Sequence, residues 1–372
     1  MARLFFDSDR RKLRFFDWTS FVILLILSCT SLFFVFSATQ ISIASISCSS
    51  FFIKQLFGVI SGFGIFFLAF FFDYRTLQKW GTVGYYVTII LLIFTLVKGS
   101  VGMGAQRWVN LGFIKFQPSE LAKLFFPAFF ATSVASDETG ELKHRSFIPV
   151  FFVLGLSVVL ILKQPDLGTA LLVLFSGILL LWLANIGRPF FIALFIVSAI
   201  SAPIAWHNLK PYQKNRIIVF LGGGTSRKER YQIEQSQIAI GSGGFWGKGF
   251  LQGTQTRLNF LPESRTDFIF SVICEELGFV GAALVIFLFG LLFLRLVIQI
   301  AFINNISAQL LAIGLLTPLI FSTVINICMV LGLLPTVGIP LPFISYGITH
   351  LWIGFASLGW CINIIARASI IP

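Results

Sequence analysis

A polar segment passes directly into a long apolar one between residues 261 and 294. The polar part reads Leu261-Pro262-Glu263-Ser264-Arg265-Thr266-Asp267, and the apolar part begins Phe268-Ile269-Phe270. A run of about 20 mostly apolar residues is long enough to cross a bilayer as a helix. Asp267 is therefore expected where an extramembrane loop enters a membrane helix. A carboxylate beside an arginine at that edge indicates a catalytic site, and a plain helix N-cap is the alternative.

The composition of the whole chain agrees with a membrane protein. Its 372 residues are 57% hydrophobic and only 11% charged, and they include 45 phenylalanines. The surface of a soluble domain needs more polar residues than this composition supplies. Continuous apolar runs, in place of short alternating segments, argue against a β-barrel. The first apolar run is too long for a cleavable signal peptide.

The predicted fold is an all-α polytopic membrane protein that forms a single domain over residues 1–372. About ten transmembrane helices are expected, separated by a large extracytoplasmic loop, residues 207–267, between spans seven and eight. The predicted spans are 18–38, 52–72, 80–97, 118–136, 147–162, 167–186, 189–206, 268–294, 306–332 and 342–365.

The charge distribution predicts the orientation of the chain. Five basic residues precede the first span, so both termini are expected on the cytoplasmic side of the cytoplasmic membrane. The loop 207–267 falls on the other side, yet it holds nine Lys or Arg residues. Long loops escape the positive-inside rule. A basic outer surface suits a phosphorylated or pyrophosphorylated ligand, and a solvated loop near anionic headgroups is the alternative. The net charge of +12 does not indicate nucleic acid, because the basic residues lie mostly in loops and at helix ends.

Two further segments at membrane edges hold candidate residues. Pro118 is predicted in the first turn of a helix, which places Glu120 and Lys123 three residues apart on one face, able to pair. The pair is either a structural ion pair or part of a site in which Arg107 or Lys123 holds an anion. Asp166 precedes span six and is expected mainly to cap that helix.

Other polar groups give weaker signals. Glu276 lies two turns into span eight next to Glu275, and at least one of the two must face the bundle. The segment 333–347, with three prolines, predicts an apolar re-entry turn buried against protein. The five cysteines are expected to be small buried hydrophobes, and His350 and the two other histidines are isolated in the sequence and indicate no metal site.

Together these segments resemble the SEDS family (shape, elongation, division and sporulation), which includes RodA and FtsW. Five blocks carry the resemblance, in family order and at family spacing: Gln106-Arg107-Trp108, Phe116 to Lys123, Gln164 to Ala170, Pro262 to Phe268 with Glu275 to Gly278, and Gly338 to Gly347. Residues 107–112 and 262–264 are more similar to RodA, the elongation branch, than to FtsW, the division branch. Where the family usually continues Ser-Tyr-Gly with Gly-Ser-Ser, this chain has Ile348-Thr349-His350.

The resemblance implies a peptidoglycan glycosyltransferase that polymerises lipid II at the outer face of the membrane, with Asp267 as its indispensable carboxylate. It also implies a class B penicillin-binding protein, a transpeptidase, as partner. The predicted substrate-binding residues are Arg107, Trp108, Gln117, Ser119, Glu120, Lys123, Asp166, Arg265, Glu276, Ser345 and Tyr346. No cofactor is assigned, and a divalent cation on the pyrophosphate is left open because the sequence gives no ligand set for one. The alternatives are a lipid II flippase, the division paralogue, or a scaffold in which Asp267 is only a helix cap.

Overall fold

The computed structural model describes residues 15–40, 48–102, 105–110, 112, 115–134, 147–209, 211–223, 227–258, 260–261 and 263–369. Helices occupy all ten predicted spans: α2 (Trp18–Thr39), α3 (Ser50–Phe71), α4 (Tyr74–Lys98), α5 (Pro118–Ser133), α6 (Phe147–Lys163), α7 (Leu167–Leu183), α8 (Arg188–Asn208), α12 (Ile269–Ala301), α13 (Ile306–Val330) and α14 (Ile348–Ala368). Within the described ranges, six of these, α2, α3, α4, α12, α13 and α14, are long and apolar enough to cross a membrane. The fold is thus helical and of membrane type, as predicted.

Polar residues at the ends of the apolar runs determine where the helices begin. Asp17 caps α2 by accepting a hydrogen bond from the Ser20 amide (3.3 Å), and Asn305 caps α13 in the same way through Ala308 (2.9 Å). Asp73 caps α4, which therefore begins at Tyr74 and not at residue 80. The predicted start of the last span at residue 342 is wrong, because α14 begins at Ile348. Residues 342–347 stay in a turn that the preceding prolines favour.

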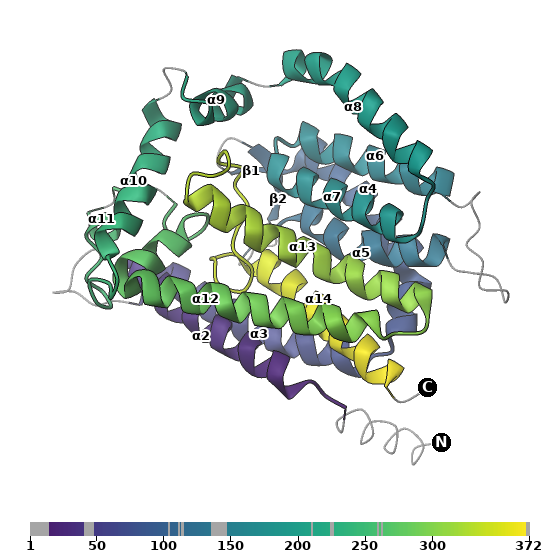
Figure 1. The fold of residues 1–372 in the computed structure, drawn as a ribbon, viewed down its shortest axis with the longest axis horizontal. Helices are drawn as coiled ribbons and strands as arrows, with labels where there is room; N and C mark the ends of the chain where they lie inside the picture. The colour runs from purple at the N-terminus through teal and green to yellow at the C-terminus, as the bar shows by residue number, and fades with distance from the viewer. Residues whose placement is uncertain are drawn as a thin grey trace.

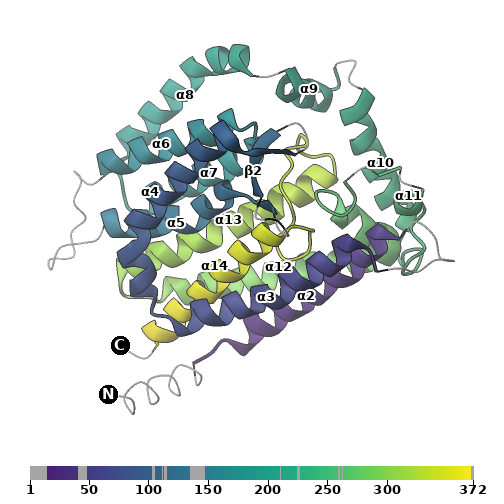
Figure 2. The ribbon, with the colours of Figure 1, turned by 180° about the vertical axis from the view of Figure 1, so that it is seen from behind.

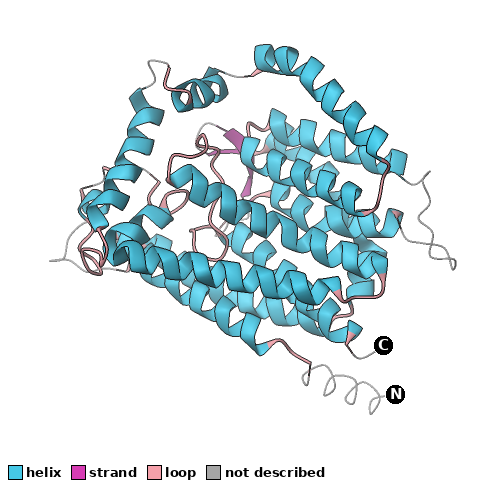
Figure 3. Cartoon of the chain, in the orientation of Figure 1, coloured by secondary structure: helices cyan, strands magenta, loops and turns pink. Residues whose placement is uncertain are grey.

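Two regions between the spans have structure that the sequence did not predict. The loop 207–267 contains three helices, α9 (Pro211–Phe220), α10 (Arg227–Gly243) and the short α11 (Thr254–Arg257). Between α4 and α5 lie three short antiparallel strands, β1 (Ser100–Gly102), β2 (Ala105–Asn110) and β3 (Lys115–Phe116), with β2 in the middle (Figure 3). The pairing of β3 with β2 places Lys115 and Phe116, just before α5, opposite Asn110 and Val109 of the strand that carries Arg107.

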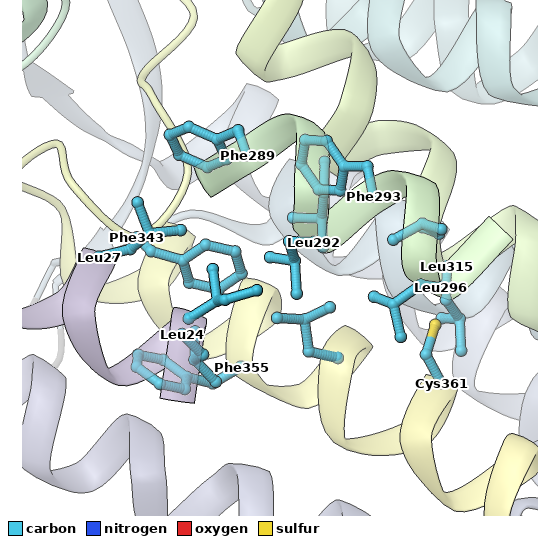
Figure 4. Packing of buried hydrophobic residues seen from close by; sticks show 14 of the residues in the cluster. Leu24, Leu27, Phe289, Leu292, Phe293, Leu296, Leu315, Phe343, Phe355 and Cys361 are labelled. Atoms are coloured by element: carbon cyan, nitrogen blue, oxygen red, sulfur yellow. The ribbon is translucent and has the colours of Figure 1, made fainter. Parts of the chain in front are cut away.

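The start of α2 and the end of α14 lie at one end of the bundle, and α10 and α11 lie at the other (Figure 1). The buried side chains form two clusters. One joins α2, α3, α12, α13 and α14, and includes Leu24, Phe289, Phe343 and Phe355 (Figure 4). The other joins α4, α6 and α7. Helix α5 contributes to both clusters and therefore lies between the two halves of the molecule.

Small residues allow the closest contacts between helices. A Cβ added to Gly81 of α4 would lie 2.6 Å from the carbonyl carbon of Ala128 in α5, and one added to Gly359 of α14 would lie 2.5 Å from the carbonyl oxygen of Phe66 in α3. Helices in membranes associate through such close backbone contacts, because the apolar lipid gives no hydrophobic driving force between them. The position of α5, and of the residues at its start, thus depends on these contacts.

Helix α8 differs from the rest of the bundle. None of its described side chains is buried, and Figures 1 and 2 show it set off from the neighbouring helices. The ring contacts that hold it are at its beginning, where Phe190 packs on Phe151 (4.3 Å) and Phe191 on Trp182 (5.0 Å). Among the cysteines, Cys274 and Cys361 are buried as expected, whereas that prediction is wrong for Cys29 and Cys48, which are exposed.

Candidate active site

The Asp267 carboxylate lies just outside the membrane helix that follows it. Helix α12 begins at Ile269 with Phe268 as its N-cap, and no side chain caps it. The alternative in which Asp267 is a helix cap is therefore wrong, and its half-buried carboxylate is available for other contacts. Glu263, at the start of the same turn, has a φ of 55°, a left-handed conformation that non-glycine residues rarely adopt.

The backbone of this turn is fixed by the polar residues packed against it. The buried amide of Asn326 in α13 donates to the Asp267 carbonyl (2.9 Å) and to the Ile339 carbonyl (2.7 Å). Ser345 donates to the Thr266 carbonyl (2.6 Å), and the Tyr346 amide donates to the Arg265 carbonyl (2.9 Å). The re-entry segment before α14 therefore holds the two residues that precede Asp267. Its residues 341–345 are buried against protein as predicted, whereas Leu333 at its start is exposed.

The charges around Asp267 come from elements far apart in the sequence. A Cβ on Gly338, whose φ is +77°, would lie 3.5 Å from Asp267 Oδ2 and 3.9 Å from Nη1 of Arg216 in α9. Burial raises the pKa of Asp267 to about 6, and the negative charge of Glu263 acts in the same direction. The charges of Arg216 and Arg107 oppose this rise. The carboxylate is thus mainly ionised at neutral pH, yet close to the pKa that suits a general base.

Asp166 is the centre of a second group of contacts. Its Oδ1 accepts a hydrogen bond from the Thr169 amide (3.2 Å), which confirms its role as cap of α7, and lies 3.5 Å from Nη1 of Arg107. Its Oδ2 accepts from the Gln117 amide group (2.6 Å) and from the Ser119 hydroxyl (3.2 Å). Asp166 therefore links β2, the start of α5 and the start of α7. Its charge also contributes to the raised pKa of Asp267.

The next residues of α5 form a third group. Pro118 is the first residue of the helix, and Glu120 pairs with Lys123 (2.6 Å), both as predicted. His350 of α14 joins them, with Nδ1 3.2 Å from Glu120 Oε2 and 3.4 Å from Lys123 Nζ. His350 is isolated in the sequence, yet the fold gives it a partner 230 positions away, which the sequence did not indicate.

The remaining predicted residues have different surroundings. Arg265 lies over the Phe51 ring (3.9 Å from Cζ to the centroid), and Tyr346 meets the same ring edge-on. Trp108 is partly exposed in β2, next to Arg107. Glu276 accepts a hydrogen bond from Ser37 of α2, and among the described residues it makes no hydrogen bond to the charged groups around Asp267. Glu275 instead holds the loop before α11, accepting from Lys248 (2.7 Å) and the Thr254 amide (2.8 Å).

The structure therefore brings Arg107, Gln117 and Ser119 together around Asp166. The charges of Arg107 and Asp166 act on Asp267, and the structure adds Arg216 as a further charge there. Sequence reasoning gave Arg216 only as one of the basic residues of the loop. Across the described residues no cluster of three or more His, Cys, Asp or Glu side chains has a metal-binding arrangement, and a divalent cation is not assigned to the site.

Comparisons with known proteins give a consistent result. Residues 17–369 match the sequence model of the cell cycle protein family of FtsW, RodA and SpoVE. The chain is 39% identical to the peptidoglycan glycosyltransferase MrdB of Escherichia coli K12 over 299 residues, which cover 78% of this chain and 79% of that protein. It is 36% identical to MrdB of Helicobacter pylori 26695 over 345 residues (91% and 87%) and 33% identical to a probable peptidoglycan glycosyltransferase FtsW of Geobacter sp. M18 over 366 residues (96% and 98%).

Solved structures agree with the sequence comparison. The crystal structure of the Rod shape determining protein RodA of Thermus thermophilus matches with a TM-score of 0.69 at 27% identity, covering 95% of this chain and 97% of that one. A chain from a study of polymerization and crosslinking by a peptidoglycan synthase complex matches with a TM-score of 0.78 at 27% identity, covering 95% and 98%. This chain therefore belongs to the FtsW, RodA and SpoVE family, the SEDS proteins.

Proposed function

We propose that this protein is a peptidoglycan glycosyltransferase that polymerises lipid II during cell elongation. The observation that carries the proposal is the Asp267 carboxylate. Its pKa of about 6 is close to that of an effective general base, and the positive charges of Arg107 and Arg216 act on it. The named relatives support the reaction class, and the higher identity to MrdB than to the FtsW relative quoted above supports the elongation branch.

In the proposed reaction, the 4-hydroxyl of the acceptor GlcNAc attacks the anomeric carbon of the donor MurNAc. The new bond joins that oxygen to the anomeric carbon, and the bond from the anomeric carbon to the pyrophosphate breaks. Asp267 takes the hydroxyl proton, a contribution of about 10²–10⁴ in rate for general bases. Polyprenyl pyrophosphate leaves with the bonding electron pair, and its growing negative charge requires nearby cations.

The cations available for this purpose lie on different elements. Arg107 is only partly engaged by Asp166, at 3.5 Å, and its Nε is buried without a hydrogen-bond partner among the described atoms. Arg216 and the Asp267 carboxylate both lie next to Gly338, within 4 Å of the position that a Cβ on this glycine would take. Arginine suits this role because its planar guanidinium can bind phosphate oxygens through two parallel hydrogen bonds. Lys123 is paired with Glu120 at 2.6 Å.

The polyprenyl tail of the substrate needs an apolar path from the bilayer. Helix α8 supports such a path, because its described side chains are not buried and most of its exposed residues, among them Phe195, Val197 and Ile200, are apolar. A lipid tail between α8 and the bundle would leave the pyrophosphate near α9, which carries Arg216. The substrate would thus reach Asp267 from the membrane side.

The proposed topology has ten spans in the cytoplasmic membrane, with both termini in the cytoplasm and the loop 207–267 outside. The start of α2 and the end of α14 lie at the same end of the bundle, which agrees with an even number of crossings. The candidate residues belong to turns and helix starts near α9. An enzyme that acts on a lipid-linked substrate outside the cytoplasm needs all of them on the outer side of the membrane. A flippase would need determinants that are accessible from both sides.

The proposed partner is a class B penicillin-binding protein, which would crosslink the new strand. Support comes from the similarity to a chain of a complex that coordinates polymerization with crosslinking. The proposal is tested by reconstituting the purified protein in vesicles with labelled lipid II, with and without the transpeptidase. Glycan polymer is the expected product. Translocation of lipid II without polymer would favour the flippase.

A further inference from the structure

The segment from Ser345 to His350 contacts both halves of the candidate site. Its first residues hold the turn before Asp267, through the bonds of Ser345 and Tyr346 to the carbonyls of Thr266 and Arg265. The segment is itself fixed by the buried Gln55 of α3, which donates to the Ser345 carbonyl (3.2 Å) and accepts from the Gly347 amide (3.3 Å). It is therefore a rigid support and not a loose connection.

The last residues of the segment hold the turn into α5. The buried Thr349 hydroxyl donates to the Lys115 carbonyl (3.2 Å), and His350 Nδ1 lies 3.2 Å from Glu120 Oε2. Between these two contacts lie Gln117 and Ser119, whose side chains bond to Asp166. The contacts made by Thr349 and His350 thus reach the Asp166 and Arg107 side of the site through the first turn of α5.

The surroundings of His350 determine how it makes its contact. The side chains of Glu120, Lys123 and His350 are all at least nine-tenths buried. Nε2 of His350 is buried and has no hydrogen-bond partner among the described atoms, so a proton there would be an unpaired buried donor, which is costly. A proton on Nδ1 has Glu120 as acceptor. We assign the Nδ1–H tautomer, in which Glu120 Oε2 accepts from both Lys123 and His350.

From this geometry we propose that His350 is a positioning residue for the glycosyl transfer. The contact between His350 and Glu120, here called the brace, holds α14 against α5. It fixes the first turn of α5 and, through Gln117, the orientation of Asp166 and Arg107. His350 is one of the three residues, 348–350, at which this chain departs from the SEDS pattern described above. The kinetic part of the inference rests on the proposed function, whereas the structural part does not.

The test compares four purified full-length proteins: wild type, His350→Ala, His350→Asn and Ser357→Ala. The asparagine amide can donate from near the position of Nδ1, so it should restore the brace. Ser357 is the matched control, because it is buried on the same face of α14 and borders the same small cavity as His350. Within the described part of the chain it makes no hydrogen bond to α5. If the alanine variant does not fold, His350→Leu fills the volume without a donor and takes its place.

Two measurements are made on each protein. Hydrogen exchange of residues 115–121 should be faster in His350→Ala and unchanged in His350→Asn and Ser357→Ala, with α6 unchanged in all. In polymerisation assays normalised to folded protein, the KM for the lipid donor should rise about tenfold or more in His350→Ala, the scale of a lost hydrogen bond to a charged group. His350→Asn should return it to near the wild-type value.

The outcomes separate the two proposals. Unchanged exchange in residues 115–121 of the alanine or leucine variant would overturn the brace. The brace would also be overturned if the alanine variant made less polymer only in proportion to its smaller amount of folded protein. In that case its KM would be unchanged and His350→Asn would restore nothing. If the wild type makes no polymer, the proposed function fails, and the exchange measurement alone decides whether the brace exists.

Discussion

The raised pKa of Asp267 predicts that the wild-type carboxylate destabilises the folded protein. The pKa of this group rises from 3.8 to about 6 on folding, chiefly because burial disfavours the charged form. For a carboxyl group whose folded pKa is raised, folding becomes less favourable as the pH rises from the unfolded to the folded pKa. The penalty is therefore absent below about pH 4 and fully present above about pH 7.

Asp267→Asn removes this charge and keeps the shape of the side chain. At about 1.4 kcal/mol per pKa unit, the shift corresponds to about 3 kcal/mol, an upper bound because the side chain is only half-buried. The variant should therefore unfold at a higher temperature than the wild type at pH 8, by a few degrees. The difference should shrink as the pH falls and vanish near pH 4.

The assay is thermal unfolding of both purified proteins in the same detergent at several pH values between 4 and 8. Glu234→Gln is a suitable control, because Glu234 is an exposed carboxyl whose ion-pair partner among the described residues is Arg230, on the surface of α10. This control should show little change at any pH. An Asp267→Asn protein that is less stable than the wild type at pH 8, or a difference that does not depend on pH, would refute the reasoning.

Three further predictions concern the reaction and the packing. The value of kcat/KM should fall as the pH is lowered, with a midpoint near 6. The Arg216→Gln variant should have a higher midpoint, because Arg216 lowers the pKa of Asp267. A wild-type midpoint near 4 would count against Asp267 as the base. Arg107→Ala should raise the KM for the lipid donor at normal expression in the membrane, whereas failure to accumulate in the membrane would mark Arg107 as structural. Gly81→Ala should lower the stability by about 1–3 kcal/mol through overpacking against Ala128, measured by thermal unfolding, while Gly64→Ala, which has open space around it, should have little effect.

Features encoded by adjacent residues could be predicted from the sequence. Apolar length predicted where the long helices lie, because the bilayer core has a fixed thickness, and six of the described helices are long and apolar enough to cross it. The spacing of Glu120 and Lys123 gave their pairing, and the position of Asp166 before an apolar run gave its role as a cap. The location of Asp267 at the edge of a membrane helix was predicted, although its distance from the helix start was not.

Features that depend on contacts between distant segments could not be predicted in this way. Arg216 meets Asp267 only because α9 folds back towards the re-entry turn at Gly338. His350 contacts Glu120 across 230 positions, so its sequence neighbours give no sign of the partner. The strands β1 to β3 are too short to leave a periodic pattern. In each case the information lies in tertiary packing and not in local propensity.

The central claim is that the Asp267 carboxylate is the base of a glycan polymerase. The most direct measurement is gel analysis of polymer formed from labelled lipid II by wild-type and folded Asp267→Asn protein, each with the transpeptidase partner. The account predicts glycan polymer from the wild type and none from the variant. Polymer at the wild-type rate from a folded Asp267→Asn protein would contradict it.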